Sequence, residues 1–384
     1  MKILMVHPHD LFSKEEPWTI RIKKIAQEFK KKGHDVKIIY FPLQLKGYQK
    51  QFCFEGIEYI PRSRKVGIKI FLSNLRFFVK ESKWCDMIHL QKCFHWAAVP
   101  SLLAAFLNRK PLHYDWDDWE IKIFYYSARQ PWFIGKFLAT LERLLPGLCD
   151  TVSVSSLRLA DECVRYGINR KYMAMAHVGA DLVEFHPNIS GIRIREKYNI
   201  SEPIISYLGQ LHGAQYAELF IRGAKIVLNH MPNLKFIIIG DGYRIDELKK
   251  ITADLDLERN LVFTGAVEHK EIPLYLAATD IAVACFEDNQ ITQCKSPLKI
   301  AEYLASGKAI VASNVGEAKR MLGGAGILTE PGCAESLAQG IIKLLEDEPL
   351  KKRLANKARI RAQEIFNWQT TANNLLSAYK TVLY

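Results

Sequence analysis

The thirteen residues from Ser296 to Lys308, SPLKIAEYLASGK, decide the fold predicted for the second half of the chain. Ser and Pro suit the cap and the first turn of a helix, so the stretch predicts a helix over Leu298–Ala305. The apolar run Ala309–Ala312 that follows has the length of a buried strand. A helix leading straight into a buried strand is typical of a parallel α/β sheet.

The same alternation extends from this stretch along the rest of the chain. Helical patterns cover Ile20–Lys32 and Tyr216–Asn229, and the chain from 334 to 384 is nearly all helical. Pro187 to Gly191 interrupts the pattern, which predicts two doubly wound parallel-sheet domains. The other predicted strands are Ile3–Val6, Val36–Phe41, Ile57–Ile60, Met87–Leu90, Leu112–Asp115, Thr151–Val154, Met173–His177, Ile204–Leu208, Phe236–Ile239, Leu261–Phe263 and Ile281–Ala284.

Length and composition agree with two globular domains. The chain has 384 residues, of which 49% are hydrophobic and 24% charged, and this excludes a disordered or coiled-coil protein. Its longest uncharged apolar run, 96–107, is shorter than the roughly 20 residues that a membrane span needs. The eight cysteines form no CxxC pair, so we expect reduced thiols and a cytoplasmic location. The apolar stretch at residues 3–6 is short and ends at His-Pro-His-Asp, so we expect no secretory leader.

The net charge of +12 is unevenly distributed. Residues 1–180 hold 29 basic and 17 acidic side chains, residues 181–350 hold 17 and 23, and residues 351–384 hold 7 and 1. A basic first half beside an acidic second half indicates that the two domains meet different partners.

Five segments share one further feature, their order and spacing along the chain. They are VGADLVEFHP at 178–187, FIIIGDG at 236–242, LVFTGAV through YLAATD at 261–280, SPLKIAEYLASGK at 296–308 and FNW at 366–368. Together they resemble the retaining GT-B glycosyltransferases of family 4, also called glycosyl transferase group 1. The resemblance implies an acceptor-binding Rossmann-like domain over 1–187, a nucleotide-sugar-binding domain over 188–365 and a helix over 366–384 that returns to the first domain.

This resemblance implies a donor site around the Ser296–Lys308 stretch. Glu302 falls on the glutamate that binds the donor ribose, since a carboxylate accepts hydrogen bonds from vicinal hydroxyls. The turn made by Ser296, Pro297, Leu298 and Lys299 would bind the diphosphate through free peptide N–H groups and the helix dipole. The alternatives are a solvated helix glutamate for Glu302 and a surface lysine for Lys299.

Three positions depart from the family pattern. Cys294 stands where a second glutamate usually meets the donor sugar. After Gly209, Gln210 and Gln215 stand where an Arg and a Lys usually neutralise the diphosphate, and an amide brings no charge. The base is expected to bind backbone near Val267, which leaves UDP and GDP equally open.

Acidic residues follow a predicted strand of the first domain, at the edge where open α/β sheets bind ligands. The resemblance implies that Asp117 and Asp118 take the catalytic places that face the acceptor, with Asp115 beside them. Mutual repulsion would raise the pKa of one of these carboxyl groups. The alternatives are a capping or salt-bridging cluster, or a metal-binding Asp115-x-Asp117 motif like that of GT-A transferases.

Histidines add to this predicted acceptor side. His7 and His9 follow the first strand, and His89 lies near the end of another. A lone histidine is more often structural than catalytic. We expect no metal and no cofactor.

Two basic stretches with apolar or aromatic residues, 62–84 and 122–133, are candidates for contact with an anionic membrane surface. The alternative is that their apolar faces pack on the sheet. No nucleic-acid recognition motif accompanies them, so we expect no nucleic-acid partner.

These features predict a glycosyltransferase that moves a sugar from a UDP- or GDP-linked donor to an acceptor hydroxyl with retention. The expected acceptor is a surface glycan or glycolipid, as in lipopolysaccharide or exopolysaccharide assembly, at the inner membrane face. The rival hypotheses are a GT-B binding or activating subunit without transferase activity, and another nucleotide-sugar enzyme such as an epimerase.

Overall fold

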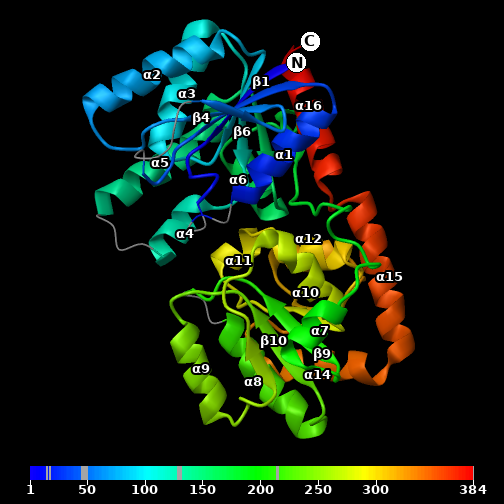
Figure 1. Cartoon of the computed structure of the whole chain (residues 1–384). Helices are drawn as coiled ribbons and strands as arrows, with labels where there is room; N and C mark the ends of the chain where they lie inside the picture. The colour runs from blue at the N-terminus through cyan, green and yellow to red at the C-terminus, as the bar shows by residue number, and fades with distance from the viewer. Residues whose placement is uncertain (14–15, 17–18, 45–50, 128–131, 213–215, 384) are drawn as a thin grey trace. The chain divides into compact units, whose positions relative to one another are not determined.

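The computed structural model describes residues 1–383 apart from 14–15, 17–18, 45–50, 128–131 and 213–215. The chain forms two compact units, each a parallel sheet with helices around it (Figure 1). Unit 1 contains Met1–His177 and Trp368–Tyr384, and unit 2 contains Val178–Asn367. Sequence analysis placed these boundaries after residues 187 and 365.

Unit 1 is built on an eight-stranded sheet in the order β3-β4-β2-β1-β5-β6-β7-β8. All neighbouring strands pair in parallel except β3, which is antiparallel to β4. The strands are β1 (Lys2–His7), β2 (Asp35–Tyr40), β3 (Phe52–Phe54), β4 (Ile57–Pro61), β5 (Met87–Gln91), β6 (Leu112–Trp116), β7 (Thr151–Val154) and β8 (Met173–Met175).

The helices of unit 1 include the last helix of the chain. That helix, α16 (Trp368–Leu383), packs against α1 (Ile20–Lys31), β7 and β8, and its buried Tyr379 hydroxyl lies 2.6 Å from Nδ1 of His89. The predicted return of the C-terminal helix to the first domain is therefore confirmed. The other helices are α2 (Ile68–Ser82), α3 (His95–Asn108), α4 (Glu120–Ser127), α5 (Trp132–Leu148), α6 (Leu157–Arg165) and the short 3₁₀ helix η2 (Arg170–Tyr172).

Unit 2 is built on a six-stranded, all-parallel sheet in the order β11-β10-β9-β12-β13-β14. Its strands are β9 (Ile204–Leu208), β10 (Lys235–Ile239), β11 (Leu261–Phe263), β12 (Ile281–Ala284), β13 (Ala309–Ser313) and β14 (Ile327–Thr329). Its helices are α7 (Ile192–Tyr198), α8 (Tyr216–His230), α9 (Ile245–Asp254), η3 (His269–Glu271), α10 (Ile272–Ala278), α11 (Gln290–Cys294), α12 (Leu298–Ala305), α13 (Gly316–Leu322), α14 (Ala334–Glu346) and α15 (Glu348–Glu364).

The predicted alternation of strands and helices is confirmed in both units. Two short strands, β3 and β14, were not predicted. The strand predicted over Met173–His177 ends at Met175, because the backbone carbonyl of His177 accepts from the side chains of Arg21 and Thr371. Within the described ranges, no helix is long and apolar enough to cross a membrane.

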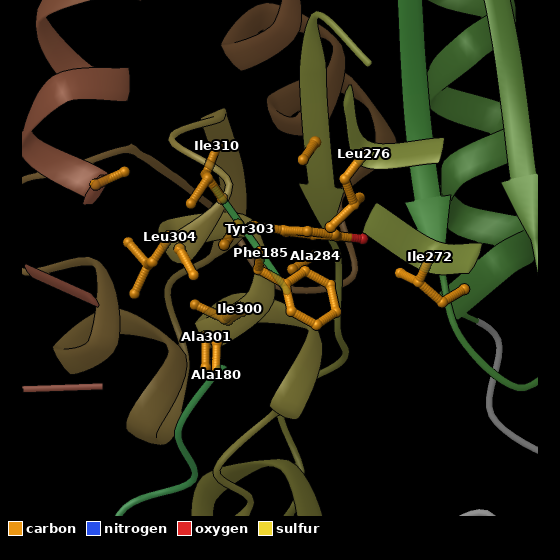
Figure 2. Packing of buried hydrophobic residues seen from close by; sticks show 14 of the residues in the cluster. Ala180, Phe185, Ile272, Leu276, Ala284, Ile300, Ala301, Tyr303, Leu304 and Ile310 are labelled. Carbon is orange, nitrogen blue, oxygen red and sulfur yellow. The ribbon is translucent and has the colours of Figure 1, made fainter. Parts of the chain in front are cut away.

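The core of unit 2 holds α12 in place. Ile300, Tyr303 and Leu304 of this helix are buried against Phe185 and other apolar side chains, part of which Figure 2 shows. The Tyr303 hydroxyl also accepts from the peptide N–H of Leu208, at 2.9 Å. The helix is thereby tied to the carboxyl end of β9, where parallel sheets of this kind bind ligands.

Candidate active site

Helix α12 begins as predicted, at Leu298, but without the predicted serine cap. Its N-cap residue is Pro297, and no side chain among the described residues caps it. The hydroxyl of Ser296 is buried and points at Sδ of Met321, 3.9 Å away. The first peptide N–H groups of the helix therefore have no side-chain acceptor in the described part of the chain and can meet an anion.

Glu302 is not a solvated helix residue, because it is only 3% exposed. Its Oε1 lies 2.6 Å from Nε2 of His269, on the 3₁₀ turn η3. No described residue donates a hydrogen bond to its Oε2. A carboxylate offers about four acceptor positions, so most of its hydrogen-bonding capacity remains for a ligand.

Lys299 lies one helical turn from Glu302, on the same side of α12. Its ammonium nitrogen lies over the ring of Tyr207, 4.1 Å from the centroid, and 5.6 Å from that of Phe286. Burial and the nearby Lys295 lower the pKa of Lys299 to about 8. Within the described part of the chain, neither lysine forms an ion pair with a carboxylate.

Two loops pack backbone to backbone beside Lys299. The peptide N–H of Leu211 donates to the carbonyl oxygen of Asp241, at 2.9 Å. Gly240 has a φ of +144°, and a Cβ there would lie 2.0 Å from the carbonyl oxygen of Gly209. A Cβ on Gly209 would in turn lie 2.7 Å from Nζ of Lys299. Glycines are therefore needed for the loops and the ammonium group to lie this close.

The other residues predicted to bind the donor differ in how exposed they are. Gln210 is exposed in the first of these loops, and Gln215 lies outside the described residues. Val267 is half-buried and packs against the core near η3. Cys294 is buried at the end of α11, so its thiol is not presented at the surface.

Asp117 lies at the carboxyl ends of three neighbouring strands of unit 1. Its Oδ2 accepts from Nε2 of Gln91 at 2.8 Å, and its Oδ1 lies 3.3 Å from Nζ of Lys92. Burial raises the pKa of Asp117, although Lys92 opposes the shift. Asp118 is half-buried, and no described side chain bonds to its carboxylate.

Lys92 is a feature of this cluster that sequence analysis missed. It is 3% exposed, adopts a left-handed φ of +67°, and bonds to Glu120 as well as Asp117. Burial raises the pKa of Glu120 to about 7, again opposed by Lys92. A lysine buried in this rare conformation indicates a constrained site, because the surrounding structure must offset the strain.

Asp115, predicted on the acceptor side, is buried and paired with an arginine. It is 0% exposed, and Arg21 donates to both of its oxygens at 2.8 Å. Burial would raise the pKa of Asp115, but Arg21 outweighs it and holds the pKa well below its usual range. With Asp115 paired to Arg21 and Asp117 to Lys92, a metal-binding Asp115-x-Asp117 motif is not supported.

The histidines of the predicted acceptor side are buried. His7 contacts Gln91 through Nδ1 at 2.9 Å, and His9 contacts Glu16 at 3.0 Å. Burial lowers the pKa of His7 and of His9, and lowers that of His89 to about 4. His89 is buried between the sheet and α16, where its Nδ1 contacts the Tyr379 hydroxyl, whereas His7 lies at the end of β1 and shares Gln91 with Asp117.

The part of the chain that the structure describes contains no group of three or more His, Cys, Asp or Glu side chains placed to hold a metal ion.

Comparison with known proteins finds a family match within the second unit. Residues 192–361 match the family model "Glycosyl transferases group 1". Alpha-D-kanosaminyltransferase of Streptomyces kanamyceticus is 22% identical over 192 residues, 49% of this chain and 48% of that protein. Mannosylfructose-phosphate synthase of Agrobacterium fabrum is 25% identical over 244 residues, 60% of this chain and 52% of that protein. The chain thus spans about half the length of these curated relatives.

Solved structures match the whole chain. Anabaena Alr3699/HepE in complex with UDP and glucose has a TM-score of 0.75 and 19% identity, with 100% of both chains covered. A glycosyltransferase from Rickettsia africae has a TM-score of 0.75 and 21% identity, covering 100% of this chain and 98% of that one. These likenesses confirm the predicted GT-B fold.

Proposed function

We propose that this chain is a glycosyltransferase that moves a sugar from a UDP- or GDP-linked donor to an acceptor hydroxyl, with retention of configuration. The observation that carries the proposal is that a buried carboxylate, Glu302, and an ammonium group, Lys299, lie on one side of α12 without forming an ion pair among the described residues. A carboxylate suits the ribose hydroxyls, and a cation suits the diphosphate.

Lys299 supplies the charge that Gln210 lacks in this proposal. Its ammonium group, the peptide N–H groups of Leu298 and Lys299, and the dipole of α12 together stabilise the leaving nucleoside diphosphate. Lys295 adds a second positive charge close by, as its effect on the pKa of Lys299 indicates. No metal ion is required for this arrangement.

The acceptor site in this proposal lies at the carboxyl ends of β1, β5 and β6. Asp118 is the better candidate for contact with the acceptor hydroxyl. Asp117 already accepts a hydrogen bond from Gln91 and forms an ion pair with Lys92. Asp117 then helps to shape the site and to set its negative charge. A carboxylate-rich edge favours a neutral or amino sugar hydroxyl over an anionic group at this point.

A binding or activating subunit without transferase activity is the second candidate. It is favoured by Gln210, an exposed amide that stands where the family usually has a cation. Catalytic turnover distinguishes a glycosyltransferase from a binding or activating subunit. We expect the full chain to release UDP or GDP from one member of a panel of nucleotide sugars when a glycan acceptor is present.

The matched variants are Glu302→Ala, which should abolish release, and Glu364→Ala, an exposed change on α15 that should not. If wild type releases no nucleotide from any donor, the transferase proposal fails; if Glu302→Ala releases it as fast as wild type, the role of Glu302 fails. Donor binding without turnover across the panel and several acceptors would favour the binding subunit.

We also propose that unit 1 contacts an anionic membrane at α2, in keeping with a glycan or lipid-linked acceptor at the cytoplasmic side. A surface groove of about 490 Å³ is lined by Arg62, Lys69, Ser73, Arg76, Leu72, Phe77 and Lys80, with four cations and no carboxylate. Ile68, at the start of the helix, is 70% exposed. Apolar groups beside cations are typical of interfacial helices.

Part of the second predicted membrane stretch, residues 128–131, lies outside the described residues. Sedimentation with vesicles of anionic lipid at about 50 mM salt tests the membrane proposal, since screening is weak there. Binding that is lost in Lys69→Glu/Lys80→Glu supports it. Equal recovery with anionic and zwitterionic vesicles contradicts it.

A further inference from the structure

Glu302 is held by one neighbour that neither the motif nor the family match assigns. Nε2 of His269 lies 2.6 Å from Oε1 of Glu302, although the two residues are 33 positions apart. The His269 side chain is 32% exposed and that of Glu302 only 4%. Since a carboxylate only accepts hydrogen bonds, the imidazole Nε2 carries the proton and donates it.

This hydrogen bond uses a small part of the Glu302 carboxylate. Of about four acceptor positions, His269 takes one on Oε1. Oε2 receives no hydrogen bond from any residue that the structure describes. The contact therefore sets the rotation of the carboxylate and leaves enough free positions for two vicinal hydroxyl groups.

His269 is itself firmly placed. It begins the 3₁₀ turn η3, and its ring lies 5.6 Å from that of Phe185, which is 1% exposed in the core of unit 2. Glu302 lies on α12, whose Tyr303 and Ile300 are in the same core. Two rigid elements thus bring donor and acceptor together, as a preorganised site requires.

The position of His269 in the chain links it to a second part of the donor. Val267, two residues earlier, belongs to the loop expected to meet the nucleobase through its backbone. A base bound at this loop and a ribose bound at Glu302 would be adjacent parts of one nucleoside. The side chain of His269 would then connect the loop that binds the base to the carboxylate that binds the ribose.

We propose that His269 is a positioning residue that orients Glu302 toward the ribose hydroxyls of the donor and joins ribose recognition to the base loop. This inference rests on the proposed function, because it needs a nucleotide at Glu302. It assigns a specificity for ribose over deoxyribose to a contact between two side chains of unit 2.

The test compares full-length wild type with His269→Leu and His269→Gln. Leu fills similar space against Phe185 without a donor, and Gln keeps an N–H donor near the place of Nε2. Calorimetry measures the binding of UDP and GDP and of 2′-deoxy-UDP and 2′-deoxy-GDP. We expect His269→Leu to lower the preference for the ribonucleotide about tenfold, and His269→Gln to restore most of it.

A double-mutant cycle with Glu302→Ala removes effects that are merely structural. If His269 acts through Glu302, the double variant binds nucleotide as weakly as Glu302→Ala alone. Losses that add, an unchanged ribose preference in His269→Leu, or tighter binding by that variant would overturn the inference. Circular dichroism checks that each variant is folded, and His269→Gln keeps the test valid if His269→Leu is not.

Failure of the proposed function looks different. Wild type that binds neither UDP nor GDP removes the proposed function and this inference with it. Wild type that binds and transfers, together with a His269→Leu variant that keeps its ribose preference, removes the inference alone.

Discussion

Replacing Lys299 with methionine should stabilise unit 2 and weaken donor binding at the same time. The ammonium group lies over Tyr207 with no carboxylate partner among the described residues, and burial lowers its pKa from 10.5 to about 8. A lowered pKa means that the folded protein disfavours the charged form. The positive charge of Lys299 therefore lowers the free energy of unfolding at pH 7. In the proposed function, its role is to bind the diphosphate of the donor.

The magnitude follows from the shift in pKa. At about 1.4 kcal/mol per pKa unit, the fall in pKa from 10.5 to about 8 corresponds to at most about 3.5 kcal/mol. Partial exposure of the ammonium group and loss of the cation–π contact with Tyr207 reduce this, so we expect Lys299→Met to be more stable by about 1 to 2 kcal/mol. Loss of a charge-assisted hydrogen bond should weaken donor binding about 10- to 100-fold.

The pH dependence gives a second, independent readout. Because only the protonated amine binds phosphate strongly, wild-type affinity should fall as pH rises through 8, by about tenfold at pH 9. Lys299→Arg cannot lose its proton in this range, so its affinity should be nearly constant from pH 7 to pH 9. Urea unfolding and calorimetric titration with the bound nucleotide measure the two effects.

Lys319→Met, an exposed change on α13, is the matched control and should alter neither quantity. The reasoning is refuted if Lys299→Met binds donor as tightly as wild type. It is also refuted if the wild-type and Lys299→Arg pH profiles coincide.

Two further predictions concern the packing around each site. Lys92→Met should destabilise the protein by about 3 to 5 kcal/mol, because it leaves Asp117 and Glu120 buried without their cation. Urea unfolding followed by tryptophan fluorescence measures this loss. A loss below about 1 kcal/mol would contradict the assigned ion pairs. Gly240→Ala should abolish nucleotide binding, because a Cβ there would lie 2.0 Å from the carbonyl oxygen of Gly209. Full binding by this variant in calorimetry would contradict the prediction and show that the loop at Gly240 can shift freely.

Much of the fold was predictable because its strands are buried on both faces and read as continuous apolar runs. The runs at Ile204–Leu208 and Phe236–Ile239 are examples, and both coincide with strands or lie within them. β3 was missed because its three residues, Phe52–Phe54, are exposed at a sheet edge and carry no core signal. β14 was missed because it is short and has only one buried residue.

The candidate site residues that belong to a sequence motif could be predicted. Those that come together only through contacts between distant parts of the chain could not. Glu302 and Lys299 are found by their place in one short stretch. The partners of Asp115 and Glu302, Arg21 and His269, are 94 and 33 residues away in the chain, and no local pattern relates them. The run of carboxylates after β6 predicted a carboxyl group with a raised pKa, but not that Lys92 would lie beside it.

The central claim is that unit 2 binds a nucleoside diphosphate sugar through Glu302. Calorimetric titration of the full chain with UDP- and GDP-linked sugars, in parallel with Glu302→Ala, tests it most directly. The account predicts saturable binding of one of the two donor classes by wild type, and binding at least about tenfold weaker by Glu302→Ala. Absence of binding by wild type to both classes, or equal affinity in the variant, would contradict it.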